Sequence, residues 1–296
     1  MKYSHPLQLL ALAITFFMAT SLSMGQVSTN NYKVNRHTDN VWTILEGNPS
    51  SNVNIYVVEG KDSALIIDTG FGSGDIKGYV QTLTKLPLII VNTHGHGDHT
   101  GGNRQFSKVY LHPDDFYMVG AGASKKMPMM MTEKPDGKIK PSQDAPVKSG
   151  SVTYIPIREG YVFNLGGRRL EVIEVPGHTH GSIVLLDREN KILFAGDNTN
   201  SIVWLFLKDC YPLEVYLKSL EKVQQRIADF NIVMPGHNTP LEKTYISEQI
   251  GAVISILDGT CKPFHYDHPS NTSGALECDY KSAKVAYDPK NLREKK

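Results

Sequence analysis

The run His94-Gly95-His96-Gly97-Asp98-His99 places four side chains that can bind a metal within six residues. Imidazole nitrogens and carboxylate oxygens are the ligands of catalytic zinc sites. The interleaved glycines leave room for the backbone to bend around an ion, so one short turn could serve two metals. His94 and His96 would face one ion, and Asp98 and His99 its neighbour. The alternative interpretation is a histidine-rich surface turn, because short motifs produce false positives.

Three later segments repeat the pattern of one His or Asp beside a glycine, directly after a short apolar run. They are Pro176-Gly177-His178, Gly196-Asp197 and Pro235-Gly236-His237. Side chains at strand ends on a rigid sheet are held well enough to act as ligands. We therefore expect these three residues to meet the turn at His94–His99.

Three features of the sequence resemble the metallo-β-lactamase-fold hydrolase superfamily. They are the His-Asp run, the three later segments in this order and the strand-like stretch Ala64–Gly70. The resemblance extends from about Tyr32 to about Ile250. It implies an α+β fold in which two mixed β-sheets flanked by helices form a four-layer αββα sandwich, with a dinuclear metal site along one edge. One group of true β-lactamases has a cysteine at the position of Asp197. The aspartate is instead similar to the glyoxalase II, lactonase and general hydrolase branches.

Carried over position by position, the resemblance implies seven metal ligands and one supporting carboxylate. Asn200 occupies a place where some lactonases carry a tyrosine, which departs from that branch. The implied ligands are His94, His96 and His178 for the first metal, Asp98, His99 and His237 for the second, and Asp197 as the bridge, with Asp68 hydrogen-bonded near the histidine loop.

Two zinc ions held about 3.5–4 Å apart lower the pKa of a water between them toward neutrality. The resemblance implies that the bridging hydroxide attacks an ester, lactone, thioester or amide bond, a β-lactam included, and that Asp98 orients the water and moves its proton. Because the set lacks a thiolate, manganese or iron remains an alternative to zinc. The positive charge of two divalent ions favours a small-molecule substrate with an anionic or carbonyl group.

Other functions remain open at this point. A two-metal site also suits a phosphodiesterase, a nuclease or a sulfatase, and a diiron redox protein can use the same fold. A purely structural zinc usually has four closed ligands, often thiolates. The formal net charge is +1, with 31 basic and 30 acidic residues, and no basic stripe indicates nucleic acid as a partner.

The N-terminus reads as a signal peptide over residues 1–25. Lys2 precedes an apolar stretch from Leu7 to Leu22, small residues follow, and Gln26 would be the first mature residue. We expect a periplasmic or secreted protein without stable membrane insertion after cleavage; the alternative is an uncleaved anchor. In an exported protein a Cys261–Cys278 disulfide is expected, which leaves Cys210 free, either near the metals or as a small packing residue.

The remaining pattern indicates one hydrolase domain over residues 26–296, with strands running into helices in residues 32–120 and again in 150–257. We expect a lid insertion over residues 120–150, where methionines and prolines cluster, and an extended or β-hairpin appendage over 258–296. His180 could bind substrate or replace a ligand, or simply be exposed. His112, His265 and His268 are interpreted as structural or surface groups. Helices are expected near 74–85, 212–230 and 242–257.

Overall fold

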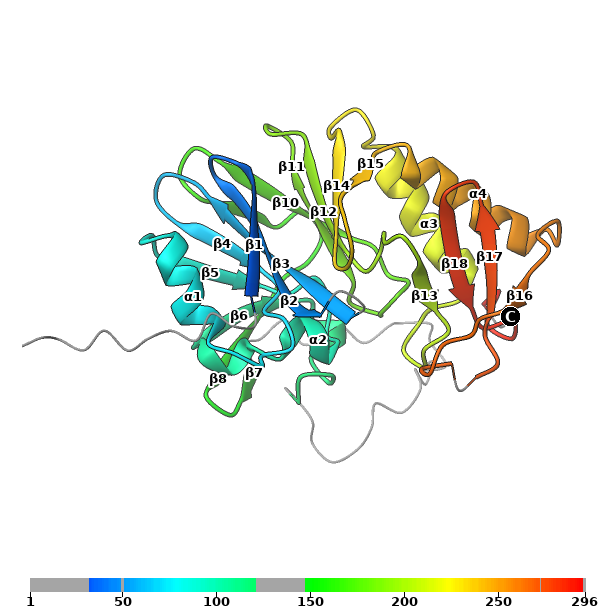
Figure 1. Ribbon diagram of the computed structural model, residues 1–296, viewed down its shortest axis with the longest axis horizontal. Helices are drawn as coiled ribbons and strands as arrows, with labels where there is room; N and C mark the ends of the chain where they lie inside the picture. Colours follow the sequence, from blue (N-terminus) through cyan, green and yellow to red (C-terminus); the bar gives the residue numbers. More distant parts are fainter. Residues whose placement is uncertain (1–31, 49–50, 121–146, 272, 295–296) are drawn as a thin grey trace, which may run out of the picture.

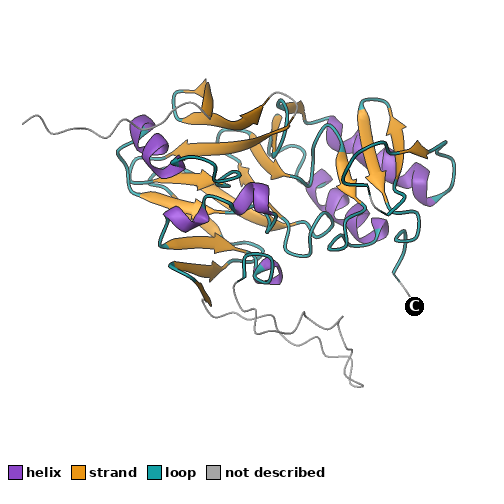
Figure 2. Cartoon of the chain, turned by 60° about the horizontal axis from the view of Figure 1, so that its bottom comes forward, coloured by secondary structure: helices purple, strands orange, loops and turns teal. Residues whose placement is uncertain are grey.

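The computed structural model describes residues 32–48, 51–120, 147–271 and 273–294. The expected signal peptide and most of the expected lid therefore lie outside the described residues. Two β-sheets lie face to face in the larger part of the molecule, and helices cover their outer faces (Figures 1 and 2). Among the described residues, no helix is both long and apolar enough to cross a bilayer.

The first sheet has eight strands in the order β1-β2-β3-β4-β5-β6-β8-β7. Strands β1 to β4 pair antiparallel, whereas β4, β5, β6 and β8 pair parallel, so the sheet is mixed. The strands are β1 (Tyr32–Thr38), β2 (Val41–Asn48), β3 (Ser51–Glu59), β4 (Ala64–Ile67), β5 (Leu88–Val91), β6 (Lys108–Leu111), β7 (Val147–Ser149) and β8 (Val152–Pro156).

The second sheet has six strands in the order β15-β14-β12-β11-β10-β9. Only β12 and β14 pair parallel. Strands β9 and β10 form a hairpin, with Gly166 and Gly167 both at positive φ in its turn. The strands are β9 (Val162–Asn164), β10 (Arg169–Glu174), β11 (Ile183–Asp187), β12 (Ile192–Gly196), β14 (Ile232–Pro235) and β15 (Leu241–Glu242).

The core lies between the two sheets, where alternate residues of each strand point inward. Leu65 and Val58 of the first sheet pack in one cluster with Leu185 and Phe194 of the second, all fully buried. Helices cover the outer faces, which confirms the αββα sandwich. The helices are α1 (Ile76–Leu83), α2 (Gly97–Thr100), α3 (Leu213–Gln224) and α4 (Tyr245–Leu257), with 3₁₀ turns at Asn103–Gln105 and Pro113–Asp115.

A third sheet lies beyond α3 and α4 and was not predicted (Figure 1). Its strand order is β13-β18-β17-β16, so the tail forms more than a hairpin. The strand β13 comes from the middle of the chain and pairs parallel with β18. Its strands are β13 (Val203–Leu205), β16 (Phe264–His265), β17 (Leu276–Tyr280) and β18 (Ala283–Tyr287).

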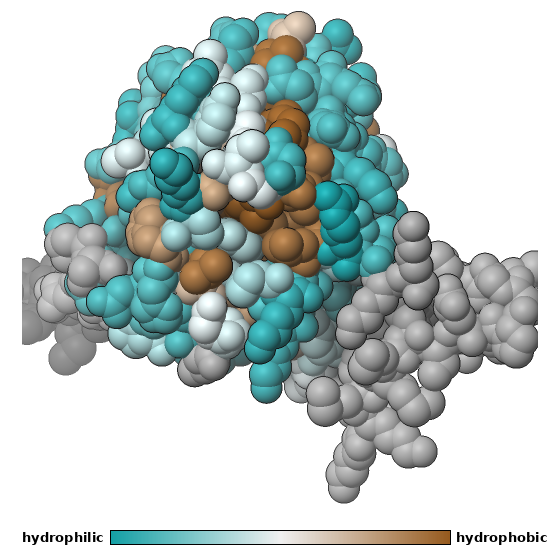
Figure 3. Space-filling view, turned by 90° about the vertical axis from the view of Figure 1, so that its right-hand side faces the viewer, coloured by the Kyte–Doolittle hydropathy of each residue, from teal (hydrophilic) through white to brown (hydrophobic). Residues whose placement is uncertain are grey.

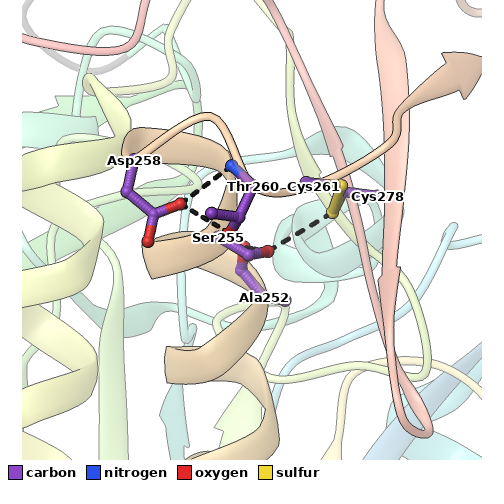
Figure 4. Close-up of a disulfide and its surroundings, with 6 residues drawn as sticks. All are labelled: Ala252, Ser255, Asp258, Thr260, Cys261 and Cys278. Carbon is purple, nitrogen blue, oxygen red and sulfur yellow. Dashed lines mark hydrogen bonds between the residues drawn. A yellow bond between two sulfur atoms is a disulfide. The ribbon is translucent and has the colours of Figure 1, made fainter.

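The expected disulfide joins the end of α4 to the third sheet (Figure 4). Cys261 follows α4, and Cys278 lies on β17. Figure 3 views this end of the molecule, where hydrophobic residues gather in a band bordered by hydrophilic ones. The exposed large apolar side chains on these elements are Ile254, Phe264 and Tyr280.

The structure corrects two element boundaries. Helix α3 ends at Gln224 rather than near Phe230, because the chain continues in turns that still bury Phe230. The strand β1 was missed because all of its residues after Tyr32 are exposed, so its sequence lacks an alternating apolar pattern.

Candidate metal centre

Seven side chains from four segments meet at one edge of the two sheets. His94, His96, Asp98 and His99 follow β5, and the last two lie on the short helix α2. His178 follows β10, Asp197 follows β12 and His237 follows β14. The structure thus brings together all seven residues that the sequence singled out.

The first group consists of His94, His96 and His178, whose ligand atoms lie close enough to share one ion. His96 Nδ1 lies 3.1 Å from His94 Nε2 and 2.9 Å from His178 Nε2. The three nitrogens face one point from three directions, since the rings of His96 and His178 are nearly perpendicular, at 85°. This arrangement suits a cation and not a set of mutual hydrogen bonds, because neutral imidazole has only one N–H.

The second group consists of Asp98, His99 and His237. His237 Nε2 lies 3.3 Å from Asp98 Oδ2 and 3.3 Å from His99 Nε2. His99 is fully buried, whereas Asp98 is partly exposed and lines the adjoining cleft. Asp98 is thus the carboxylate of this group that a substrate or water can reach.

Asp197 lies between the two groups. Its Oδ2 is 3.6 Å from His178 Nε2 and 3.3 Å from His237 Nε2, and its Oδ1 is 3.4 Å from His99 Nε2. Oδ1 is buried and has no hydrogen-bond partner within the described part of the chain. A buried carboxylate oxygen without a partner is costly. Its environment therefore fits a cation, and the five imidazoles and two carboxylates are a suitable donor set for zinc.

Hydrogen bonds from outside the cluster orient three of the histidines. His178 Nδ1 lies 2.8 Å from the carbonyl oxygen of Trp204, and His237 Nδ1 contacts the carbonyl oxygen of Asn52. Each bond places a proton on Nδ1 and leaves Nε2 free to bind an ion. His99 Nδ1 is held in the same way by Asp68 Oδ2, at 2.8 Å.

Asp68 is the carboxylate that the sequence placed near the histidine loop. Its Oδ1 accepts a hydrogen bond from the backbone N–H of Thr93, and its Oδ2 accepts one from the Thr93 hydroxyl, both at 2.8 Å. Asp68 has a φ of 64°, a conformation that aspartate tolerates better than most residues. It follows β4 and so fixes the turn between β5 and α2 to the neighbouring strand.

Sequence reasoning missed Asp209, whose Oδ2 lies 2.7 Å from His96 Nε2. This contact orients His96 with Nδ1 toward the cluster. The sequence offered no signal for it, because Asp209 lies 113 residues from His96 in an irregular segment.

Sequence reasoning also missed Asp115, which is fully buried. Its carboxylate accepts hydrogen bonds from the backbone of Gly95 at 2.8 Å, from the Thr179 hydroxyl at 2.7 Å and from the backbone of Gly181 at 2.7 Å. Asp115 therefore ties the loop of His94–His99 to the loop of His178.

The charges in the cluster compensate one another when no ion is bound. Burial opposes protonation of His237, but the charge of Asp197 and hydrogen bonds to Asp197 and Asp98 raise its pKa to about 10. Burial and neighbouring imidazoles lower the pKa of His178 to about 4. His178 is therefore neutral and ready to bind a cation. Burial also opposes protonation of His96, but the Asp209 carboxylate raises its pKa, so His96, like His237, must release any proton to bind one.

His180, His112, His265, His268 and Cys210 are not among the clustered ligands. His180 packs against Tyr211, with ring centroids 4.3 Å apart and the rings tilted by 40°. Cys210 is free and buried, and its thiol donates to the carbonyl oxygen of His178. His112 bonds to Glu174, and His265 is exposed. His268 corrects an expectation, because it lines the cleft beside the cluster.

The cleft over the cluster has a volume of about 690 Å³ and two chemically different sides. The side near His237 carries polar groups, namely Ser51, Asn52, Asn200 and Asn238. The larger apolar and aromatic side chains that line the cleft are Ile202, Trp204, Leu207, Tyr266 and His268, with Phe71 and Ser270 also in the lining.

Comparison with known proteins agrees with this geometry. Residues 49–237 match the family model described as the metallo-beta-lactamase superfamily. The chain is 31% identical over 212 residues to "Acyl-coenzyme A thioesterase MBLAC2" of Homo sapiens, covering 63% of this chain and 73% of that protein. It is 27% identical over 208 residues to "Atrochrysone carboxyl ACP thioesterase" of Aspergillus fumigatus, covering 67% and 56%.

A solved metallo-beta-lactamase from Pontibacter korlensis superposes with a TM-score of 0.55 at 22% identity, covering 74% of this chain and 97% of that one. At this identity the likeness concerns the fold alone. The matched residues 49–237 include all four segments of the cluster. The chain therefore belongs to the metallo-beta-lactamase superfamily and is a hydrolase of that superfamily.

Proposed function

We propose that the protein is an exported hydrolase that holds two zinc ions and cleaves a carbonyl ester or thioester, with lactones and amides as related substrates. The single observation that carries this proposal is Asp197, whose unpartnered buried oxygen lies between two groups of ligand atoms. The names of the two thioesterase relatives support a thioester within this range.

His94, His96 and His178 would hold one ion, Asp98, His99 and His237 the other, and Asp197 would contact both. Bound there, two zinc ions lower the pKa of water and polarise a carbonyl oxygen. Asp98 is the partly exposed carboxylate at the floor of the cleft, where it can accept a hydrogen bond from the attacking water and hold its proton. The polar side of the cleft can orient the carbonyl group.

Two single substitutions, at histidines that are only two residues apart, test the proposed zinc binding and the number of bound ions. His178→Ala removes a ligand of the first group, and we expect it to lose metal and nearly all turnover. His180→Ala is the matched control, because the ring of His180 packs against Tyr211 outside the cluster. It should keep both. Equal metal content in the two variants, measured by elemental analysis, would refute the assignment.

The reaction class is tested with a panel of substrates and the zinc-loaded protein. Nitrocefin, a lactone, a thioester, a p-nitrophenyl ester and bis-p-nitrophenyl phosphate should be compared with and without chelator. We expect chelator-sensitive turnover of the esters and the thioester. Turnover of the phosphodiester alone would overturn the proposal in favour of a phosphodiesterase.

Export is supported by the residues that precede the domain and by the disulfide. Lys2 and the apolar stretch Leu7–Leu22 are typical of a signal peptide, and disulfides persist mainly in oxidising compartments. We expect the mature protein from producing cells to begin at Gln26, as read by N-terminal sequencing. A start at Met1 would instead favour an uncleaved N-terminal segment.

A further inference from the structure

Four aromatic rings form a continuous cluster beside the candidate metal centre. The indole of Trp204 meets the ring of His268 at 4.6 Å between centroids, and Tyr266 stacks on His268 at 5.6 Å with an interplanar angle of 8°. Phe206 closes the cluster behind them, 5.4 Å from Trp204 and 5.5 Å from Tyr266. Each ring thus contacts at least two others. We call these four residues, Trp204, Phe206, Tyr266 and His268, the aromatic wall; it is a packed surface rather than a set of separate side chains.

The wall is attached directly to a proposed metal ligand. The carbonyl oxygen of Trp204 accepts the Nδ1 hydrogen bond of His178, so the backbone that carries the indole also orients the imidazole. Trp204 is the middle residue of β13, which pairs with β18. The distance from the wall to the reacting centre is therefore fixed by the third sheet.

The other half of the wall comes from one closed loop. Tyr266 and His268 lie between Cys261 and Cys278, which are joined by the disulfide. Within the same loop, Asn271 donates hydrogen bonds to the carbonyl oxygens of Tyr266 and Ala275. The disulfide and these bonds hold the loop in place, because closing a loop reduces its conformational freedom.

The wall is apolar, whereas the opposite side of the cleft is polar. Ile202 and Leu207 belong to the same apolar cluster as the indole, phenyl and phenol rings of the wall and also line the cleft, and no lysine or arginine is among the described residues that line it. An anionic group would find no side-chain cation on this side. A neutral apolar chain would instead displace water from the rings and the two aliphatic side chains.

We propose that Ile202, Trp204, Tyr266 and His268 form the subsite for the apolar acyl chain of the substrate. This inference rests on the proposed function and names its substrate class: acyl esters or thioesters whose chain is long enough to reach His268. The carbonyl group lies at the metal cluster, and the acyl chain extends over Trp204 toward the disulfide loop.

The subsite is tested with p-nitrophenyl acetate and p-nitrophenyl octanoate. Burial of each additional methylene group should increase kcat/KM about two- to fourfold. The wild type should therefore have a kcat/KM for the octanoate that is at least about tenfold higher than for the acetate. Ile202→Asp puts a charge beside the wall, and Trp204→Ala removes the indole but keeps the carbonyl that holds His178. Both should retain zinc and lose most of the preference, measured as the ratio of kcat/KM for octanoate to kcat/KM for acetate.

Phe264→Ala is the matched control. Phe264 lies in the same disulfide loop, is 49% exposed and does not line the cleft. It should keep the octanoate preference. An unchanged preference in both Ile202→Asp and Trp204→Ala, with wild-type zinc content, would overturn the subsite.

Binding of free octanoate separates this inference from the proposed function. Isothermal titration of octanoate into the zinc-loaded protein should give binding that is at least about tenfold weaker in Ile202→Asp than in Phe264→Ala, a difference typical of a lost apolar contact. If the wild type cleaves no ester but this difference persists, the subsite stands and the proposed reaction fails. If esters are cleaved but the three proteins bind octanoate equally, the subsite fails and the reaction stands.

Discussion

The residues around the candidate metal centre form two sets. One set presents ligand atoms to the ion position, and the other orients those ligands through hydrogen bonds. Four of the five imidazoles present a nitrogen inward while a carbonyl or carboxylate oxygen holds the opposite nitrogen of the ring, and the hydroxyl of Thr93 contacts that nitrogen in His94. The oxygens of Trp204, Asp68 and Asp209 do this for His178, His99 and His96. Such outer contacts fix the tautomer and the direction of the ligand.

Asp209→Ala removes the acceptor that orients His96. We expect zinc affinity to fall by about 10- to 100-fold, the usual cost of losing such a partner. Competition with a chromophoric chelator would measure it. Asp209→Asn keeps an oxygen acceptor and should retain most of the affinity. If Asp209→Ala binds zinc as tightly as the wild type, the contact does not orient the ligand.

The seven clustered residues were predictable from the sequence because they lie in four glycine-containing segments that each follow an apolar strand. Gly236 shows why the glycine matters: a Cβ there would lie 2.1 Å from Asp197 Oδ1. Asp115 and Asp209 were not predictable. Their hydrogen bonds join loops that are distant in the sequence, and a single aspartate in an irregular segment carries no pattern.

At the scale of elements, the sandwich could be predicted and the third sheet could not. Strands of the sandwich have buried apolar runs, such as Leu65-Ile66-Ile67, that periodicity recognises. The strand β13 has only three residues and pairs with β18, which lies about 80 residues later in the sequence. Short strands with distant partners give no local signal, so the tail was taken for an appendage and His268 for a surface group.

The double variant Cys261→Ser, Cys278→Ser opens the loop that carries Tyr266 and His268. Closure of a loop of this length stabilises a fold by about 3 kcal/mol in the chain-entropy view. We expect a lower midpoint of thermal unfolding and a higher KM for p-nitrophenyl octanoate, with zinc content unchanged. Cys210→Ser is the control, since that thiol is free. Wild-type KM in the double variant would show that the disulfide does not hold the wall.

A side-chain hydrogen bond joins the ends of β6 and β10 across the two sheets. His112 Nε2 lies 2.8 Å from Glu174 Oε1. This hydrogen bond, together with one from the backbone of Glu159 and against the opposing effect of burial, lowers the pKa of Glu174 from 4.5 to about 2. Because the folded pKa is the lower one, the stabilisation is present above pH 4.5 and is lost as the pH falls toward 2.

Glu174→Gln should therefore lower the free energy of unfolding at pH 7 by about 1 kcal/mol, a value reduced for partial exposure to solvent. The difference from the wild type should shrink between pH 4.5 and 2. Urea titrations at several pH values would measure it. Glu189→Gln, at an exposed turn, is the control and should match the wild type throughout. A difference that is constant with pH would exclude the ionic contribution.

At the scale of the whole molecule, the sandwich and the third sheet contribute different parts of the site. The ends of strands from both sheets of the sandwich supply the ligand atoms, so metal binding depends on the docking of one half of the sandwich onto the other. The third sheet supplies the proposed acyl-chain subsite, and its strand β13 also orients His178 through the carbonyl oxygen of Trp204.

The central claim is that the seven side chains share two ions. Anomalous diffraction at the zinc edge from crystals of the zinc-loaded protein tests it directly. We predict two peaks about 3.5–4 Å apart, one about 2.0–2.2 Å from nitrogens of His94, His96 and His178, the other beside Asp98, His99 and His237, with Asp197 between them. A single peak, or peaks away from these residues, would contradict the account.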